Sequence, residues 1–245
     1  DLAIGARGVC KDGDRCGPRE ARAPARVELY AGADLAGDPP ESRRLEVPRG
    51  RALSCFGDTV AAVGDLDGDG FGDLAVAAED EGGAGRVFVY FGQAPTHESG
   101  APALTDPVSL QPSGASPRFG DALVGPGDVD GDGYDDLLVG DRGAGRAWLY
   151  RGGMDRDDLD RPGIEIMASA AGDADDPQFG AAVARAGDPD GDGHPNIAVG
   201  APRARSENGL VALFRWQGPD ESVTPAGALE GGGGGFGEAV ADVGD

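Results

Sequence analysis

Residues that hold zinc or activate a nucleophile are scarce in this sequence. The 245 residues include only three cysteines and two histidines. His97 lies in a connection that contains Pro and Ser, His194 lies in an acidic loop, and no Gly-x-Ser-x-Gly motif is present. Zinc sites are built from clustered His and Cys, and no such cluster accompanies the acids. We therefore expect no enzyme activity in this segment, and the activity of a longer parent protein stays open.

The three cysteines bear on the redox compartment. Cys10 and Cys16 bracket a short polar stretch, and a small disulfide between them is one alternative that would fit an oxidising compartment. The sequence leaves open whether these two are bonded. Cys55 immediately precedes Phe56 and is expected to be an unpaired, buried thiol.

Basic residues and long apolar segments are also in short supply. The chain has 21 Lys and Arg against 44 Asp and Glu, which gives a formal net charge of −23. Such a charge disfavours nucleic acid and anionic membrane surfaces as partners. The apolar runs have the length of strands and not of helices, so we expect no membrane insertion. These runs, together with 39% hydrophobic residues, are typical of a folded all-β protein.

Acidic residues at alternate positions recur three times. The motifs read DLDGDGFGD at residues 65–73, DVDGDGYDD at 128–136 and DPDGDGHPN at 188–196. Glycines between the acids permit a tight loop in which the carboxylates converge on one point. A flexible loop that offers many oxygen ligands suits calcium better than magnesium. We therefore predict three calcium loops, of which the third is weaker because Asn196 replaces the last acid.

A Phe-Gly pair is coupled to each acidic motif. The pair begins at Phe56, Phe119, Phe179 and Phe236, and the first acid follows nine residues later, at Asp65, Asp128, Asp188 and Asp245. Both features recur every 60 residues or so, which indicates an internal repeat. The predicted repeat units are 1–54 (partial), 55–117, 118–178, 179–235 and 236–245 (partial).

Each repeat unit contains short strand-like segments. An apolar run follows the acids at 74–78, 137–140 and 197–200, a second run lies at 86–90, 146–150 and 210–214, and a weaker segment follows at 108–110, 164–166 and 226–229. About four short strands per repeat, with many Gly and Pro between them, indicate a β-propeller. The Phe of each Phe-Gly pair is expected to fill the joint between neighbouring blades.

The order of these motifs resembles a known family. Phe-Gly, then Asp-x-Asp-Gly-Asp-Gly-x-x-Asp, then the corner Gly200-Ala201-Pro202 is similar to the FG-GAP repeat of integrin alpha chains and of many bacterial surface and secreted proteins, and we expect the bacterial type. Only one repeat spells the Gly-Ala-Pro corner in full. The resemblance implies an all-β, seven-bladed parent propeller, of which this chain holds about four blades.

The resemblance also implies where calcium binds, namely in the hairpin between the first two strands of a blade. The side-chain ligands would be Asp65, Asp67, Asp69 and Asp73; Asp128, Asp130, Asp132 and Asp136; and Asp188, Asp190, Asp192 and Asn196. The backbone carbonyls of Phe71, Tyr134 and His194 would complete the three sites. Asp1 and Asp245 would be partial sites. An EF-hand is excluded because its twelfth position must be an acid, and that position is Val76, Val139 or Val199 here.

The two ends of the chain align with the interior of an acidic loop. Residues 1–6 align with 73–78, and the last three residues align with Val63 to Asp65. We expect a piece cut from a longer chain. The alternative is a closed four-bladed ring in which the two ends are neighbours.

Two functions are compatible with this organisation. The first is a calcium-stabilised extracellular interaction or adhesion-like module, secreted or at the cell surface, that binds a protein or glycan partner through its variable loops. The alternative is the accessory propeller of a secreted hydrolase or lyase, an architecture similar to that of GPI-specific phospholipase D. The sequence that flanks this segment would discriminate between them.

Overall fold

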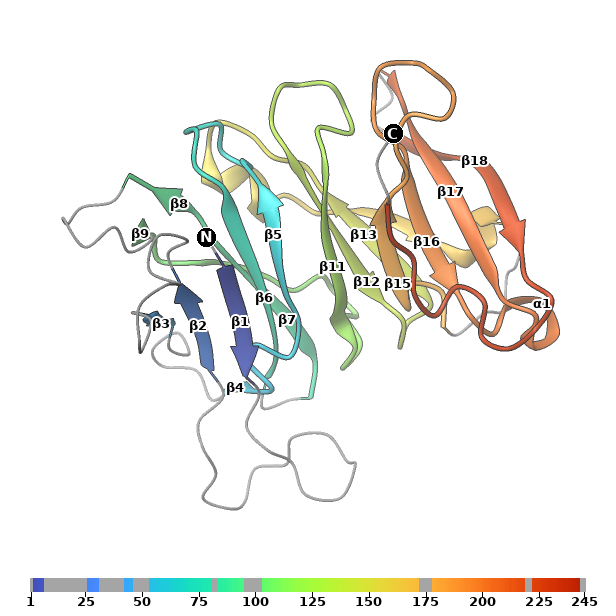
Figure 1. Cartoon of the computed structure of the whole chain (residues 1–245), viewed down its shortest axis with the longest axis horizontal. Coiled ribbons are helices and arrows are strands. Elements are labelled where there is room, and N and C mark those ends of the chain that lie inside the picture. Colours follow the sequence, from blue (N-terminus) through green and yellow to red (C-terminus); the bar gives the residue numbers. More distant parts are fainter. Residues whose placement is uncertain are drawn as a thin grey trace.

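The described structure is built almost entirely of β-strands. The computed structural model describes residues 2–6, 26–30, 42–45, 53–80, 83–94, 103–171, 178–218 and 222–242. Its strands form successive antiparallel sheets that lie side by side in chain order (Figure 1). The predicted all-β fold class is therefore confirmed.

The first half of the chain contributes two of the larger sheets. The first sheet has the order β1 (Leu2–Ala6), β2 (Arg26–Tyr30), β3 (Ser42–Leu45). The second has the order β10 (Val108–Leu110), β7 (Gly85–Tyr90), β6 (Asp73–Asp80), with both β4 (Leu53–Ser54) and β5 (Val60–Gly64) paired to β6. A two-stranded ribbon, β8 (Gly92–Gln93) and β9 (Ala103–Leu104), accompanies them.

The second half contributes two four-stranded meanders. One runs β11 (Phe119–Gly127), β12 (Asp136–Asp141), β13 (Arg146–Tyr150), β14 (Ile164–Met167). The next runs β15 (Ala182–Arg185), β16 (Ile197–Ala201), β17 (Leu210–Gln217), β18 (Ser222–Glu230). The helical pieces are short: η2 (Arg156–Asp160), η3 (Ala168–Ala171) and α1 (Ala204–Glu207).

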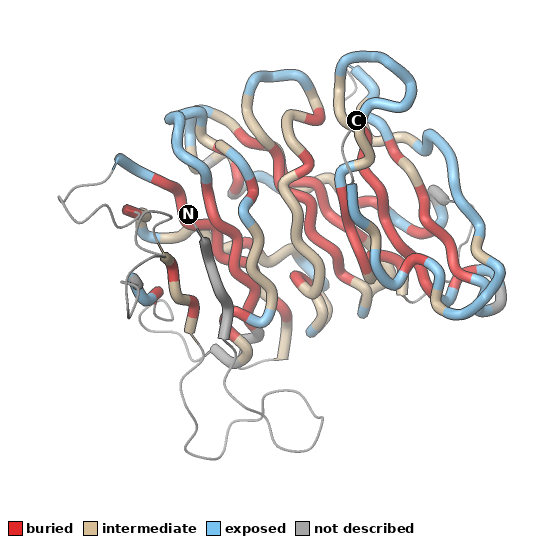
Figure 2. The backbone as a smooth tube through the Cα atoms, in the orientation of Figure 1, coloured by how far each residue is buried: buried red, intermediate tan, exposed pale blue. Residues whose placement is uncertain are grey.

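The core lies between sheets. Strands β12 and β16 are buried along their whole length. β12 lies between the second and fourth sheets, whereas β16 packs against the third sheet on one face and is covered on the other by the segment after β18, which includes Val240. Figure 2 shows this as buried central strands bounded by exposed loops at the sheet edges. Burial on both faces is typical of parallel sheets, but here the stacking of antiparallel sheets produces it.

The Phe of three Phe-Gly pairs, at 56, 119 and 179, is buried between sheets as predicted, whereas Phe236 is 39% exposed and does not fill such a joint. Phe119 packs with Val87 of the second sheet and Val139 of the third, and Phe179 packs with Leu138 of the third and Phe214 of the fourth. The rings of Phe179 and Phe214 meet edge to face, with centroids 6.2 Å apart. Both joints therefore gain apolar burial from one residue per repeat.

The Gly of the pair is required for a different reason, namely the close approach of two backbones. Gly180 has a φ of +87°, and a Cβ built on it would lie 2.2 Å from the carbonyl oxygen of Arg146 in the preceding sheet. Gly140 of β12 faces the same contact, since its Cβ would lie 2.2 Å from the oxygen of Gly180. Two backbones thus approach more closely than any side chain would permit.

One cysteine prediction is wrong. Cys55 is disulfide-bonded and only partly buried, so it is not a free, buried thiol. Its φ of +57° places it in a turn before Phe56. The other two cysteines, Cys10 and Cys16, lie outside the described residues. Adjacency to a buried Phe was a poor guide, because it says nothing about which distant segment reaches the turn.

Candidate metal centre

The three acidic motifs occupy equivalent hairpins. They connect β5 to β6, β11 to β12, and β15 to β16, and all three loops lie at the same edge of the sheets, toward the top of Figure 1. The structure therefore brings each repeat's acids to a strand-to-strand turn, in the place that the sequence predicts.

The first acid of each loop organises the turn. Asp128 Oδ1 accepts the backbone N–H groups of Gly131 (2.7 Å) and Asp132 (3.1 Å), and its Oδ2 accepts that of Gly133 (2.9 Å). Asp188 repeats this pattern, and these backbone hydrogen bonds lower the pKa of its carboxyl. The N–H groups can turn inward because Gly131 and Gly133 have φ of +78° and +95°.

Carboxylates converge in each loop. One oxygen from each of three acids lies within 4.8 Å of the others, and the groups are Asp65, Asp67 and Asp73; Asp128, Asp130 and Asp136; and Asp188, Asp190 and Asp192. The remaining acids of the first two loops, Asp69 and Asp132, accept the N–H of Phe71 (2.9 Å) and Tyr134 (3.0 Å) instead. At such separations like charges repel by roughly 3 kcal/mol per pair at an effective dielectric near 20.

The last acid of the first two loops is buried. Asp136 accepts the backbone N–H of Val129 (2.8 Å) and Gly152 (3.0 Å), and Asp73 occupies the same position in its own loop. Burial raises the pKa of Asp136 to about 8 and that of Asp73 to about 7, despite these hydrogen bonds. Neighbouring loop acids raise both values further. A nearby cation would stabilise both carboxylates in their charged form.

The third loop differs for a local reason. Asn196 is buried, and its Nδ2 has no hydrogen-bond partner. Leu66 and Val129 donate their N–H to the last acid of their loops, but the corresponding residue of the third loop is Pro189, which has no N–H to donate. The third loop therefore lacks both the last carboxylate, which Asn196 replaces, and the N–H that would donate to it, which Pro189 removes.

An arginine contacts the second acid of every loop, which sequence reasoning missed. In the second loop, Nη1 of Arg151, the residue after β13, lies 3.1 Å from Oδ2 of Asp130. In the third loop, Nη1 of Arg215, at the equivalent position, lies 3.1 Å from Oδ2 of Asp190. The first repeat has Phe91 at this position. Arg156 of η2, from the next sheet, instead lies over the Phe91 ring (4.7 Å) and contacts Asp67 at 2.8 Å.

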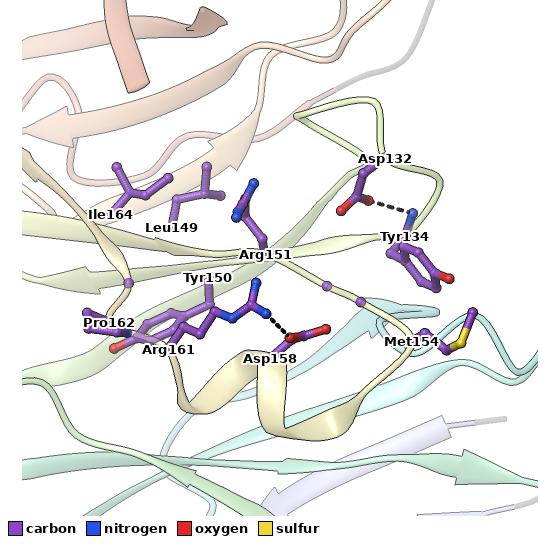
Figure 3. A pocket seen from close by; sticks show the side chains of 13 residues that line it. Asp132, Tyr134, Leu149, Tyr150, Arg151, Met154, Asp158, Arg161, Pro162 and Ile164 are labelled. Carbon is purple, nitrogen blue, oxygen red and sulfur yellow. Dashed lines mark hydrogen bonds and ion pairs between the residues drawn. The ribbon is translucent and has the colours of Figure 1, made fainter. Parts of the chain in front are cut away.

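A cleft adjoins the second loop. Its volume is about 480 Å³, and Figure 3 shows Asp132 and Tyr134 on one side of it and η2 with the residues that follow it on another. Asp158 and Arg161 form an ion pair of 2.7 Å there, and Met154 is 81% exposed. The cleft is a hollow beside the loop and not part of the carboxylate cluster.

The geometry of the loops does not test which residues bind a metal ion. The residues assigned as carbonyl ligands, Phe71, Tyr134 and His194, each donate their N–H to the preceding acid of the loop. Asp1 and Asp245 lie outside the described residues, as does His97. The full ligand sets of the three loops therefore stay predictions.

Comparison with known proteins identifies the repeat. The family model described as FG-GAP repeat matches residues 56–90, which run from the first Phe-Gly pair through the acidic loop to the end of β7. This chain carries the FG-GAP repeat. Because FG-GAP repeats build β-propeller blades, the stacked sheets are those of a β-propeller, as the sequence predicts.

Integrin alpha chains are similar to this FG-GAP chain over longer stretches. Integrin alpha-5 of Xenopus laevis is 35% identical over 175 residues, which are 69% of this chain and 15% of the relative. Integrin alpha-IIb of Homo sapiens is 43% identical over 98 residues (39% of this chain, 9% of the relative). Integrin alpha-V of Gallus gallus is 43% identical over 116 residues (46% and 10%). The chain thus matches less than a fifth of these relatives' lengths. The described residues include no helix with the length and apolar character needed to cross a membrane.

Proposed function

We propose that the three acidic loops bind calcium and that the bound ions clamp the first hairpin of each blade in an adhesion-type β-propeller module. The observation that carries this proposal is the convergence of three carboxylates within 4.8 Å in every loop. All donors in these groups are oxygens, which are the ligands that calcium prefers. The similarity to integrin alpha chains supports an interaction module rather than an enzyme.

The proposed ligands are those that the motif assigns. In the first loop they are the side chains of Asp65, Asp67, Asp69 and Asp73 with the carbonyl of Phe71, and the other two loops follow the same positions. The buried last acid fits a bound cation, because a charged carboxylate at Asp136 needs compensation that two N–H groups do not fully supply. When bound, calcium would supply charge neutralisation and would fix the turn.

Calcium should therefore be a stability determinant. With free calcium a hundredfold above the dissociation constant, each site would stabilise the fold by about 2.7 kcal/mol. We expect the melting temperature to fall strongly when a chelator is added to the calcium-loaded chain. Differential scanning calorimetry with and without excess chelator measures this shift.

A matched variant separates loop binding from general charge effects. Asp130→Ala removes a carboxylate from the second cluster, whereas Asp106→Ala removes an exposed carboxylate outside the loops. Only the first variant should reduce the difference between the loaded and chelated melting temperatures. A chelator effect below one or two degrees in the unaltered chain would show that calcium is not a structural clamp.

The partner-binding surface is proposed to lie outside the acidic loops. The variable connections between strands, such as the one that forms a wall of the 480 Å³ cleft, differ between repeats and would contact a protein or glycan. We place the parent protein outside the cell or at its surface, by analogy with the integrin alpha relatives. Surface biotinylation of intact cells that express the full-length protein tests this location.

A further inference from the structure

The first and second acidic loops are hydrogen-bonded to each other. The backbone N–H of Asp65 donates to Oδ2 of Asp135 at 2.8 Å, and the N–H of Asp135 donates to the carbonyl oxygen of Asp65 at 3.1 Å. The N–H of Gly153 donates to the carbonyl oxygen of Leu66 at 2.8 Å. Three hydrogen bonds thus join residues that lie about 70 to 87 positions apart in the sequence but side by side in space.

Side chains of the second loop also fill space left by glycines of the first. A Cβ built on Gly68 would lie 2.6 Å from Cε1 of Tyr134, and one built on Gly64 would lie 2.0 Å from Oδ2 of Asp135. A side chain at Gly64 or Gly68 would displace the side chain of Asp135 or Tyr134 from its present position. The contact is therefore specific to glycine in the first loop and to Tyr134 and Asp135 in the second.

These contacts join ligand-bearing segments directly. Asp65 is the first proposed ligand of its loop, and Asp135 lies between Asp132 and Asp136 of the next. Asp135 is not a member of the converging carboxylate group and has its side chain turned to the first loop. Whatever fixes the backbone from Asp132 to Asp136 also fixes the acceptor that holds Asp65.

The second and third loops touch without this hydrogen-bonded link. A Cβ built on Gly131 would lie 2.2 Å from Cε1 of His194, so the side chain of His194 takes the place that Tyr134 takes in the first contact. The residue that corresponds to Asp135 is Pro195, which has neither an N–H nor a carboxylate. Among the described loops, the junction between the first and second is hydrogen-bonded, and the junction between the second and third has only packing.

We propose that Asp135 is a positioning residue that couples calcium binding in the first two loops, so that occupancy of one raises the affinity of the other. The coupling between the second and third loops is weaker, because Pro195 provides no link. This inference rests on the proposed calcium function. Coupling between sites is reciprocal, and a link of this kind typically changes affinity by about five- to 150-fold.

Calorimetric calcium titrations of three variant chains test the coupling. Asp190→Ala disables the third loop and gives a two-loop chain. Adding Asp130→Ala or Asp67→Ala weakens the second or the first loop as well, so that only the remaining loop fills over the calcium range of the titration. If the loops are independent, the two-loop titration equals the sum of the two single-loop titrations. We expect instead that the two-loop chain binds at least fivefold more tightly than that sum, with a Hill coefficient above 1.

Adding Asp135→Ala to each of these chains tests whether Asp135 carries the coupling. It removes no proposed ligand, and we expect the two-loop titration to return to within twofold of the sum of the single loops. Asp106→Ala is the matched control and should leave the excess affinity unchanged. Tyr134→Ala, which keeps the Asp135 carboxylate, should remove part of the excess and provides a readout if Asp135→Ala fails to fold.

The outcomes separate this inference from the function on which it rests. Absence of calcium binding in every chain would overturn the proposed function itself. Calcium binding in which the two-loop chain equals the sum of single loops would leave that function standing and would overturn the coupling. An excess affinity that survives both Asp135→Ala and Tyr134→Ala would show that the coupling runs through other residues.

Discussion

At the scale of single residues, the last position of each acidic loop shows most clearly how burial and charge are balanced. Asp136 is completely buried and shares its environment with two other loop acids. Its pKa of about 8 lies well above its ordinary value of 3.8, mainly because burial penalises the charged form. Asn196 holds the same position in the third loop without a charge, next to a proline that offers no N–H.

The raised pKa of Asp136 predicts how the metal-free chain responds to pH. The folded state binds a proton between pH 4 and pH 8 that the unfolded state has already lost, so this group's stabilisation is present at low pH and is lost as pH rises toward 8. We expect Asp136→Asn to flatten the pH dependence of unfolding between pH 5 and pH 8 in chelator. Urea unfolding at several pH values measures it. An identical slope in the variant and the unaltered chain would contradict the assigned pKa.

Ligand charge should rank the effects of single substitutions. Asp130→Ala removes a charged side chain from the proposed ligands of its loop, whereas Asn196→Ala removes a neutral one. A charge-assisted interaction contributes about 1.5–3 kcal/mol, so we expect Asp130→Ala to weaken its site roughly ten- to 100-fold and Asn196→Ala to weaken its own site less. Site-resolved calcium titrations measure both. Equal losses would contradict this ranking of the ligands.

At the scale of secondary-structure elements, the Phe-Gly pair explains how one sheet is fitted to the next. The Phe side chain fills the apolar joint, and the Gly admits a backbone contact with the preceding sheet. Phe179 is fully buried, whereas Phe236, its counterpart after the last described sheet, is 39% exposed. The same motif therefore contributes differently according to what packs against it.

Because of this difference in burial, we expect replacement of the two Phe side chains by Ala to lower the free energy of unfolding by different amounts. Phe179→Ala removes a buried ring between two sheets and should lower the free energy of unfolding by about 3–5 kcal/mol. Phe236→Ala should cost less than half as much, because its ring still contacts solvent. Denaturant unfolding in saturating calcium measures both variants. Equal costs would show that the joint does not depend on Phe179 in the way described.

At the scale of the whole molecule, the acidic loops concentrate charge along one edge of the propeller. The chain carries a formal net charge of −23, and the three clusters of carboxylates lie in neighbouring hairpins at that edge. Three bound calcium ions would offset part of this charge where it is densest.

Salt should therefore change the melting temperature of the metal-free chain and of the calcium-bound chain by different amounts. Raising NaCl from low to about 0.5 M screens repulsion between charges, with a Debye length that falls from about 10 Å at 0.1 M toward a few Å. We expect the melting temperature of the chelated chain to rise more than that of the chain in saturating calcium. Calorimetry over a salt series measures both, and equal increments would mean that loop repulsion does not limit the metal-free fold.

The local parts of the candidate site were predictable from the sequence. An acidic loop closes within nine residues, and its turn depends on glycines and on hydrogen bonds to neighbouring N–H groups, all of which are written in the motif itself. The repeat of Phe-Gly and acids at constant separation likewise fixed the position of each hairpin between strands. These features rest on short-range interactions, so residue identity and spacing determine them.

The remaining features depend on which distant segments meet. The bond from Asp65 to Asp135 spans 70 residues, and that from Arg156 to Asp67 spans 89. The prediction of a free thiol at Cys55, which is disulfide-bonded, was wrong for the same reason. The sequence by itself determined that three loops can gather carboxylates around one point and that repeated blades carry them. Only the tertiary structure decided which loops touch and through which side chains, because stacking of the sheets creates those contacts and no local pattern encodes them.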